Sequence, residues 1–396
     1  MAIEDACEGD VTLLSSNEMA ASSAHLAIHS SACSPEEAYY DALSALPCQI
    51  SFSFSSTEKK SAAKPSKASL EAVDSLQAVI FTLNNDNPSF DTASTICQRF
   101  IPKNLSARGL MVRSTSDLLP WGASGDEVEL GSGTTGTVYL YAHAVSHRPV
   151  ALKVMSVPPK DCCQEDRRQV ISKLKQEVRI LTALGNKDWF PEFYGCIKVG
   201  PDTVGIAMEF CGDESKGKSY SIADCVEGYG PHLSRDDWMG VMQDVADGLI
   251  VMHRRGFLCN DLKEDNVLVV ESEGEWGVKI VDFGWSSSIN KPLRLRFTAS
   301  QKQGYKDEQI YSQIAPECAL DGKPCSVSSD VYALGRLTAF VGQRMGLKDL
   351  EDFGMYIYKC PREKRPSLKD YIAEVTCLRN GGSMGSESSD DSNEDL

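Results

Sequence analysis

The chain is poor in the residue patterns that build zinc sites and disulfide frameworks. Six of its 396 residues are histidine and 14 are cysteine, but no two cysteines have the C-x-x-C spacing, and Cys162 and Cys163 are adjacent. Zinc knuckles and secreted disulfide scaffolds need paired cysteines at set spacings. The sequence therefore supports neither class, and we expect reduced thiols in an intracellular protein that is cytoplasmic, nuclear or both.

Long apolar runs and an excess of basic residues are also absent. No apolar stretch approaches the roughly 20 residues that cross a bilayer, and the first residues, Met1-Ala2-Ile3-Glu4-Asp5, are acidic where a secretory signal would be basic. The formal net charge is −16 at pH 7, whereas nucleic-acid binding needs exposed lysine and arginine to neutralise phosphates. We therefore expect neither a membrane segment nor a nucleic-acid partner.

The composition changes twice along the chain and predicts three regions. Residues 1–121 are rich in serine and alanine, so we expect a partly disordered N-terminal extension with short helices. Residues 122–377 carry the motifs described below, and a hydrophobic content of 42% is enough to bury one domain of about 250 residues. Residues 378–396 are acidic and serine-rich, and we expect a disordered tail.

One helix is expected inside the N-terminal extension. Apolar residues recur there at spacings of three and four, which is the pattern of an amphipathic helix. They are Leu70, Val73, Leu76, Ile80 and Leu83. Such a stripe usually packs against the protein's own core. The alternative interpretation is a docking helix that binds a regulator or a substrate.

Two acidic signatures in the second half of the chain indicate phosphoryl transfer. They are Asp261-Leu262-Lys263-Glu264-Asp265-Asn266 and Asp282-Phe283-Gly284. Moving a phosphoryl group requires a carboxylate near the accepting hydroxyl, a cation near the γ-phosphate and oxygen ligands for magnesium. Asp261 and Lys263 are the candidates for the first two roles. Asn266 and Asp282 are the candidate magnesium ligands, since hard oxygen donors suit this ion.

A glycine-rich segment upstream predicts a phosphate-binding hairpin. It has the pattern G-x-G-x-x-G-x-V, and its residues are Gly131, Gly133, Gly136 and Val138, preceded by Leu130. Missing Cβ atoms let backbone N–H groups approach phosphate oxygens. The same glycine spacing also opens the helix of dinucleotide-binding folds. Here the flanking residues alternate and are rich in β-branched and aromatic types, which favours a loop between two strands.

A third strand, predicted just after Pro149, places Lys153 among apolar neighbours. A lysine in such surroundings needs an anionic partner. Glu177 is the candidate, because it falls on the inward stripe of a predicted helix. The apolar members of that stripe are Val170, Leu174, Val178, Leu181 and Leu184. We expect the two charged side chains to pair and to hold the lysine at the α- and β-phosphates.

Another helix is expected to begin after Ser234 and to lead toward the first acidic signature. The apolar residues of its inward face are Trp238, Met242, Val245, Leu249 and Met252. His253 follows at its end, and we interpret it as a surface residue with a structural role. No histidine has a nucleophile or a third metal ligand nearby in the sequence, so a histidine-based mechanism is not favoured.

In this order, the motifs resemble the eukaryotic protein kinase family over about residues 126–376. Three later segments resemble its remaining landmarks, and they are Ala315-Pro316-Glu317, residues 329–335 and Arg365-Pro366-Ser367. The resemblance implies an α+β fold of two lobes, with a small β-rich N-lobe that contains one key helix and a larger helical C-lobe. It also implies ATP and Mg²⁺ as cofactors, a protein as substrate, and an ion pair between Glu317 and Arg365.

The resemblance also assigns the adenine end of the site. Residues 206–212 resemble the fifth strand and the hinge of protein kinases. This implies that adenine bonds to the backbone of Glu209 and Cys211 behind the side chain of Met208. The residues that would enclose the ring are Val138, Ala151 and Leu268.

Several positions depart from the family pattern. Cys259-Asn260 stands where the family usually has His-Arg, which implies that the activation segment is switched without the usual contact from arginine to phosphate. Ile310 stands where serine/threonine kinases usually carry a threonine, whereas Lys263 resembles that class. A serine or threonine acceptor is therefore favoured, and dual specificity stays open. The short separation of Glu317 and Arg365 suggests a compact C-lobe with weaker peptide docking.

Two other functions stay open beside protein phosphorylation. A pseudokinase that serves as an ATP-binding or scaffolding protein in signalling is the alternative that Cys259 and Asn260 suggest. The retention of Lys153, Asp261 and Asp282 speaks against it. A small-molecule kinase of related fold is the second alternative, but such enzymes generally lack the Ala-Pro-Glu motif.

Overall fold

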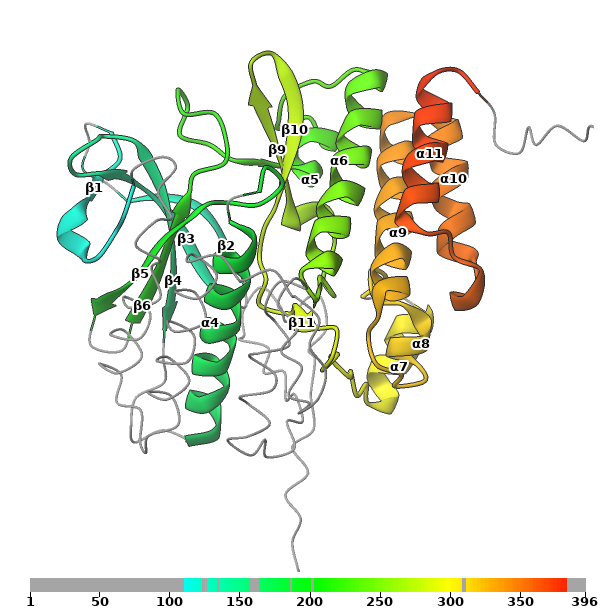
Figure 1. The fold of residues 1–396 in the computed structure, drawn as a ribbon, viewed down its shortest axis with the longest axis horizontal. Coiled ribbons are helices and arrows are strands. Elements are labelled where there is room, and N and C mark those ends of the chain that lie inside the picture. Colours follow the sequence, from blue (N-terminus) through cyan, green and yellow to red (C-terminus); the bar gives the residue numbers. More distant parts are fainter. Residues whose placement is uncertain are drawn as a thin grey trace, which may run out of the picture.

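The computed structural model describes residues 110–382, except for residues 123–124, 126, 134, 157–163, 186, 201–202 and 308–310. The predictions for residues 1–109, for Ile310 and for the tail after residue 382 lie outside the described residues. The described chain folds into two lobes, one built around a β-sheet and one mostly helical (Figure 1). This is the two-lobed α+β architecture that the resemblance implied.

The N-lobe is an antiparallel sheet with the strand order β1-β3-β4-β6-β5, in which β2 also pairs with β3. Its strands are β1 (Leu118–Pro120), β2 (Val128–Gly133), β3 (Gly136–His143), β4 (Pro149–Ser156), β5 (Phe193–Gly200) and β6 (Thr203–Glu209). The predicted hairpin is present, because β2 and β3 pair with Gly133 opposite Gly136. Strand β1 and the 3-10 helix before it, η1 (Thr115–Asp117), were not predicted.

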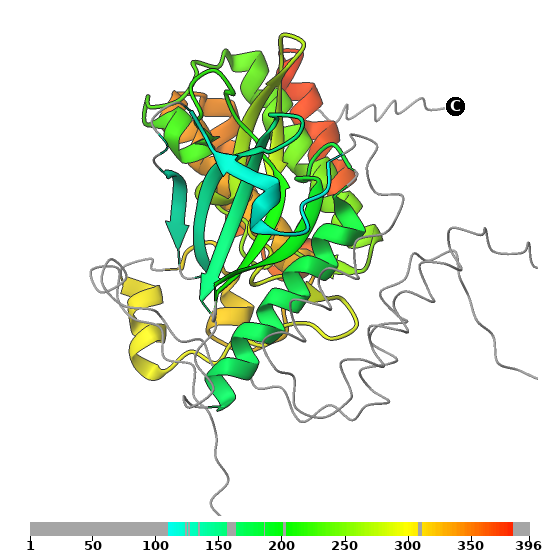
Figure 2. The same cartoon turned by 90° about the vertical axis from the view of Figure 1, so that its left-hand side faces the viewer.

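Helix α4 (Gln164–Leu184) lies beside the N-lobe sheet and crosses it diagonally in Figure 2. The apolar stripe predicted for it is almost fully buried, with relative exposures of 1% for Leu174, 2% for Val178, 1% for Leu181 and 0% for Leu184. Residues three and four apart share one face of a helix. Turning this face inward therefore also buries Glu177, which is 2% exposed.

The C-lobe is mostly helical. Its helices are α5 (Ile222–Val226), α6 (Arg235–Arg254), α7 (Ala299–Asp307), α8 (Pro316–Ala319), α9 (Val327–Met345), α10 (Lys348–Lys359) and α11 (Leu368–Arg379). Short strands and turns connect them, namely β7 (Tyr220–Ser221), β8 (Phe257–Leu258), β9 (Val267–Ser272), β10 (Glu275–Ile280), β11 (Ser287–Ser288), η2 (Glu264–Asn266) and η3 (Arg362–Lys364). Within the described part of the chain, no helix has the length and apolar character needed to cross a bilayer.

Helix α6 begins where the sequence predicted. The Ser234 hydroxyl accepts the N–H of Asp237 at 3.2 Å, and the Asp237 carboxylate accepts the N–H of Ser234 at 2.8 Å. This reciprocal capping box satisfies backbone groups that have no partner inside the helix. The predicted apolar face is buried, with exposures of 1% or less for Trp238, Met242, Val245, Leu249 and Met252.

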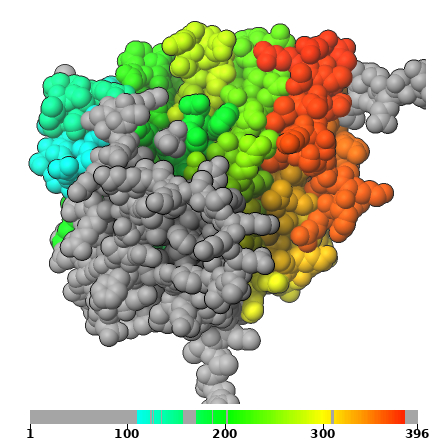
Figure 3. Space-filling view, viewed as in Figure 1, coloured from blue at the N-terminus to red at the C-terminus, as the bar shows by residue number. Residues whose placement is uncertain are grey.

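Helices α9 and α10 pack closely at the far side of the C-lobe, where α10 and α11 appear in orange to red in Figure 3. Gly354 makes this approach possible, because a Cβ atom at that position would lie 2.2 Å from the backbone nitrogen of Ala339. The closely packed helices α9 and α10 therefore form a base for the C-lobe. Loops that extend from this base toward the N-lobe carry the acidic signatures (Figure 1).

Candidate active site

A cavity of about 930 Å³ lies where residues of both lobes meet. Every site residue that the sequence predicted lines it. From the N-lobe and hinge these are Leu130, Gly131, Gly133, Gly136, Val138, Ala151, Lys153, Glu177, Met208, Glu209 and Cys211, and from the C-lobe they are Asp261, Lys263, Asn266, Leu268 and Asp282. The fold thus brings together residues that lie far apart in the sequence.

Lys153 of β4 joins the two lobes inside this cavity. Its ammonium lies 2.7 Å from Oε1 of Glu177 and 3.0 Å from Oδ1 of Asp282, and the residue is 4% exposed. Burial acts to lower the pKa of Lys153, but the carboxylates of Glu177 and Asp282 raise it above its usual value. The lysine is therefore charged and held in one position by two carboxylates.

Asp282 has an unusual backbone conformation, and polar groups surround its carboxylate. Its φ of 59° lies in the left-handed region that residues other than glycine rarely adopt. Burial acts to raise its pKa, but Lys153 lowers the pKa below its usual range. The Thr135 hydroxyl donates to Oδ2 at 3.2 Å, and the N–H of Gly284 donates to Oδ1 at 3.2 Å. Backbone strain of this kind is common at functional sites.

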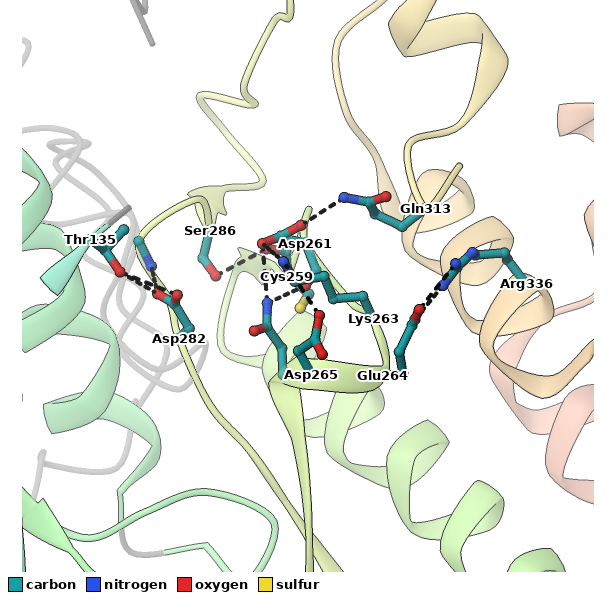
Figure 4. A network of polar contacts seen from close by, with 12 residues as sticks. Thr135, Cys259, Asp261, Lys263, Glu264, Asp265, Asp282, Ser286, Gln313 and Arg336 are labelled. Carbon is teal, nitrogen blue, oxygen red and sulfur yellow. Dashed lines mark hydrogen bonds and ion pairs between the residues drawn. The ribbon is translucent and has the colours of Figure 1, made fainter. Parts of the chain in front are cut away.

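Thr135 is a site residue that the sequence analysis missed. It lies in the glycine-rich loop, and its contact with Asp282 links that loop to the C-lobe (Figure 4). Its position between Gly133 and Gly136 was a signal that could have identified it. A hydroxyl inside a predicted phosphate loop is a natural donor to the groups beneath the loop.

Asp261 lies at the centre of the C-lobe side of the cavity (Figure 4). Asn266 donates through Nδ2 to its backbone carbonyl at 2.9 Å and to Oδ2 at 3.1 Å, and the Lys263 ammonium lies 3.9 Å from Oδ2. Gln313 donates through Nε2 to Oδ1 at 3.2 Å. Burial raises the pKa of Asp261, while Lys263 and Gln313 act in the opposite direction.

The glycine-rich loop has the space and the backbone that a phosphate needs. At Gly136 the φ is 143°, and a Cβ atom would lie 2.4 Å from the carbonyl oxygen of Val154, so only glycine fits there. At Gly131 and Gly133, a Cβ atom would meet no heavy atom of the described residues within 4 Å. Both of these glycines line the cavity, and the described residues leave open space around their Cα atoms.

Glu209, at the end of β6, and Cys211 also line the cavity. The N–H of Glu209 donates to the carbonyl of Glu192 at 2.8 Å, and its carboxylate lies 2.8 Å from the Lys279 ammonium. The Glu209 carbonyl accepts a weak contact of 3.5 Å from the Cys211 thiol. Glu209 therefore links β6 both to the segment before β5 and to β10.

A buried carboxylate supports the loop that carries Asp261. Asp330 of α9 is 1% exposed and accepts the N–H groups of Cys259 and Asn260, each at 2.9 Å. It also lies 2.8 Å from Nε2 of His253, whose side chain is 10% exposed. The interpretation of His253 as a surface residue is therefore wrong. The fold uses the imidazole to complete the set of partners around a buried charge, and such charges need several partners.

Asn260 holds the segment that follows Asp282 in a way the sequence did not predict. It has a φ of 64° and donates through Nδ2 to the carbonyl of Trp285 at 2.8 Å and to the hydroxyl of Ser287 at 2.9 Å. Both contacts are hydrogen bonds between uncharged groups of the same chain. The neighbouring Cys259 is packed in the core, and burial raises the pKa of its thiol, which disfavours a reactive thiolate.

The predicted pair between Glu317 and Arg365 is present. Its two N–O distances are 2.6 and 2.9 Å, so the contact is bidentate. Both side chains are buried, with exposures of 8% for Glu317 and 3% for Arg365. Bidentate contacts of this type combine strength with a defined geometry. The pair anchors α8, the helix that ends the segment leading from Asp282.

Comparison with known proteins shows that the sequence resembles one family. A family model described as protein kinase domain matches residues 125–345. Serine/threonine-protein kinase mig-15 of Caenorhabditis elegans is 28% identical over 215 residues, which cover 52% of this chain and 18% of the relative.

Two further relatives are similar to part of this chain. Misshapen-like kinase 1 of Rattus norvegicus is 28% identical over 249 residues, which cover 61% of this chain and 17% of the relative. Serine/threonine-protein kinase hippo of Drosophila melanogaster is 25% identical over 193 residues, which cover 49% of this chain and 26% of the relative. The match thus spans only 17% to 26% of the length of these three relatives.

Proposed function

The chain belongs to the protein kinase family, and we propose that it transfers the γ-phosphate of magnesium-bound ATP to serine or threonine hydroxyls of protein substrates. One observation carries this proposal. The Lys153 ammonium contacts both Glu177, at 2.7 Å, and Asp282, at 3.0 Å, in the cavity that also contains Asp261. A cation, a metal-ligand candidate and a candidate base thus share one site.

The residues present fit a magnesium ion. Asn266 makes both of its bonds to Asp261 through Nδ2, so its side-chain oxygen, Oδ1, takes part in neither bond. Asp282 presents a carboxylate beside Lys153, and the two residues line the same cavity. Magnesium is usually held by one or two carboxylates together with substrate phosphates, so two side chains suffice. When bound, the ion would neutralise phosphate charge.

The remaining residues position the two substrates. Lys153 would contact the α- and β-phosphates, and the backbone of the loop at Gly131 and Gly133 would cover them. The backbone of Glu209 and Cys211 would bond adenine behind Met208. The side chains that would enclose the ring are Val138, Ala151 and Leu268. Positioning accounts for most of the catalysis in this reaction class.

The chemistry at the acceptor end involves Asp261 and Lys263. The substrate hydroxyl oxygen forms a bond to the γ-phosphorus while the bond from that phosphorus to the β–γ bridging oxygen breaks, and ADP leaves. Asp261 orients the hydroxyl and takes its proton late, after which the proton passes to solvent. Lys263, whose ammonium is 3.9 Å from Oδ2 of Asp261, stabilises the charge on the transferred group.

Two observations support serine or threonine as the acceptor. Lys263 has the position that resembles serine/threonine kinases, and two of the relatives are named serine/threonine-protein kinases.

We also retain the helix predicted at residues 70–83 as a docking element for a regulator. The net charge of −16 argues against a nucleic-acid partner.

The test is transfer of labelled phosphate from ATP to a peptide library, with a panel of small hydroxyl compounds run in parallel. Asp261→Asn and Asp282→Ala should each lower the peptide rate by about 10²- to 10⁴-fold. Asp352→Asn is the matched control, since its carboxylate is 54% exposed on α10.

The outcomes separate the candidate functions. Nucleotide binding without transfer would favour a pseudokinase, the alternative suggested by Asn260 and its neutral contacts. Transfer to small hydroxyl compounds in place of peptides would favour a small-molecule kinase of related fold. Loss of transfer in Asp261→Asn, with the control unchanged, is the result that we expect.

A further inference from the structure

The Asp261 carboxylate has a donor on each of its oxygens. Asn266, five residues away in the same loop, donates to Oδ2 at 3.1 Å. Gln313, which is 52 residues away, donates to Oδ1 at 3.2 Å. In Figure 4 the Gln313 side chain points at Asp261 from the side opposite Asp282. Sequence reasoning gave no sign of this second contact.

The residue before Gln313 is also held. The Ser312 hydroxyl accepts Nε of Arg336, from helix α9, at 2.8 Å. The same guanidinium donates to both carboxylate oxygens of Glu264, one of them at 3.2 Å. Burial acts to raise the pKa of Glu264, but Arg336 lowers it, so the pair is charged. Arg336 therefore joins the loop of Asp261 to the segment of Gln313 (Figure 4).

We propose that Gln313 is a positioning residue for Asp261, and that Arg336 keeps it in place through Ser312. The inference deepens the proposed function and rests on it. A carboxyl group turns easily about its terminal torsion, which has broad minima. Donors on both oxygens restrict this rotation, since a turn would break the bond from Asn266 and the bond from Gln313 together.

The arrangement leaves room for the substrate. Each carboxylate oxygen has two lone pairs, so Oδ1 of Asp261 can accept Gln313 and an incoming hydroxyl at once. A carboxamide does not titrate, so it donates at every working pH. Gln313 lines the same cavity as Lys263 and Asp261. It therefore orients the group that receives the hydroxyl proton without taking part in proton transfer.

Peptide phosphorylation by the full chain tests the proposal in two variants. Gln313→Met keeps the length of the side chain and removes the donor, and kcat should fall about tenfold or more, while KM for peptide and KM for ATP change less than about twofold. Ser312→Ala removes the acceptor for Arg336, and kcat should fall by a smaller factor. Both variants should unfold at the wild-type temperature.

A matched control and a double variant sharpen the test. Gln303→Met removes a glutamine-to-aspartate hydrogen bond of the same kind, to Asp307, on the exposed face of α7, and kcat should not change. If Ser312 acts through Gln313, then the double variant of Ser312→Ala and Gln313→Met should be no slower than Gln313→Met alone.

The results that would contradict the proposal can be told apart. An unchanged kcat in Gln313→Met, or a raised peptide KM with kcat unchanged, would overturn the positioning role and indicate peptide docking. Multiplied losses in the double variant would overturn the link through Ser312. A wild-type chain that transfers no phosphate would overturn this inference and the proposed function together, whereas an active wild type with an unaffected Gln313 variant overturns only this one.

Discussion

Replacing Arg365 by leucine should destabilise the folded chain by about 3–5 kcal/mol, because it leaves the buried carboxylate of Glu317 without its charged partner. The contact is bidentate, at 2.6 and 2.9 Å, and the two side chains are 3% and 8% exposed. Water therefore screens the ion pair little, and the loss of one partner should lower the free energy of unfolding by nearly the full amount expected for a buried pair.

The other contacts of Arg365 set the difference between two substitutions. Its guanidinium also donates to the carbonyls of Ser328, at 3.0 Å, and Cys360, at 3.3 Å, and it lies 4.9 Å from the centre of the Tyr332 ring. Arg365→Leu loses all of these contacts. Glu317→Gln keeps them and leaves an amide that can still accept a hydrogen bond, so we expect a smaller loss of about 1–3 kcal/mol.

Stability should also depend on pH through this pair. Burial acts to raise the pKa of Glu317, but the contact with Arg365 lowers it below the unfolded value of about 4.3. The carboxylate therefore contributes stability that is fully present above the unfolded pKa and is lost as the pH falls through the lower folded pKa. Glu317→Gln should lack this acid loss, so its stability should fall less below pH 4 or so than that of the wild type.

Equilibrium urea unfolding, followed by circular dichroism at several pH values, measures these effects. Lys348→Met is the control, because its side chain is 72% exposed and its partners, Glu351 and Asp352, lie on the same surface helix. We expect the control to lose less than about 1 kcal/mol. A loss in Arg365→Leu no greater than that of the control would refute the reasoning.

Three further substitutions test the site and the packing. Glu177→Gln should lower kcat/KM for ATP by about 10- to 100-fold, as measured by steady-state kinetics, because Lys153 loses its 2.7 Å carboxylate contact and keeps only that to Asp282. Gly136→Ala should weaken nucleotide binding in calorimetry, since its φ is 143° and its Cβ would lie 2.4 Å from a backbone oxygen. Gly354→Ala should lower stability by about 1–3 kcal/mol in urea unfolding through overpacking of α9 against α10, with kcat unchanged at temperatures where the variant is folded.

The sequence predicted much of the fold because several of its patterns are local. Alternation on either side of Gly133 predicted the hairpin of β2 and β3, and spacings of three and four predicted α4 with Glu177 inward. Capping at Ser234 predicted the start of α6. Each of these patterns depends on residues within one or two turns, so the chain's own periodicity reveals it.

The same logic failed where a contact joins distant segments. The position of His253 at the end of α6 suggested a surface residue, because nothing near it in the sequence announces Asp330, which is 77 residues away. Gln313 was missed as a partner of Asp261 for the same reason, whereas Thr135 was missed as a partner of Asp282 although its place in the glycine-rich loop was a signal. The roles assigned to the site residues remain predictions that the kinetic experiments above would test.

The sequence by itself determined the family and which residue types supply charge, backbone space and metal ligands, because the order and spacing of motifs such as Asp261–Asn266 and Asp282–Gly284 are properties of the chain alone. Only the tertiary structure decided which neutral side chains complete the site. Asn260 reaches Trp285, and Gln313 reaches Asp261, because the packing of α9 and the loops around it brings those backbones within hydrogen-bond distance. Hydrogen bonds act over about 3 Å, so such partners depend on where separate segments meet in space.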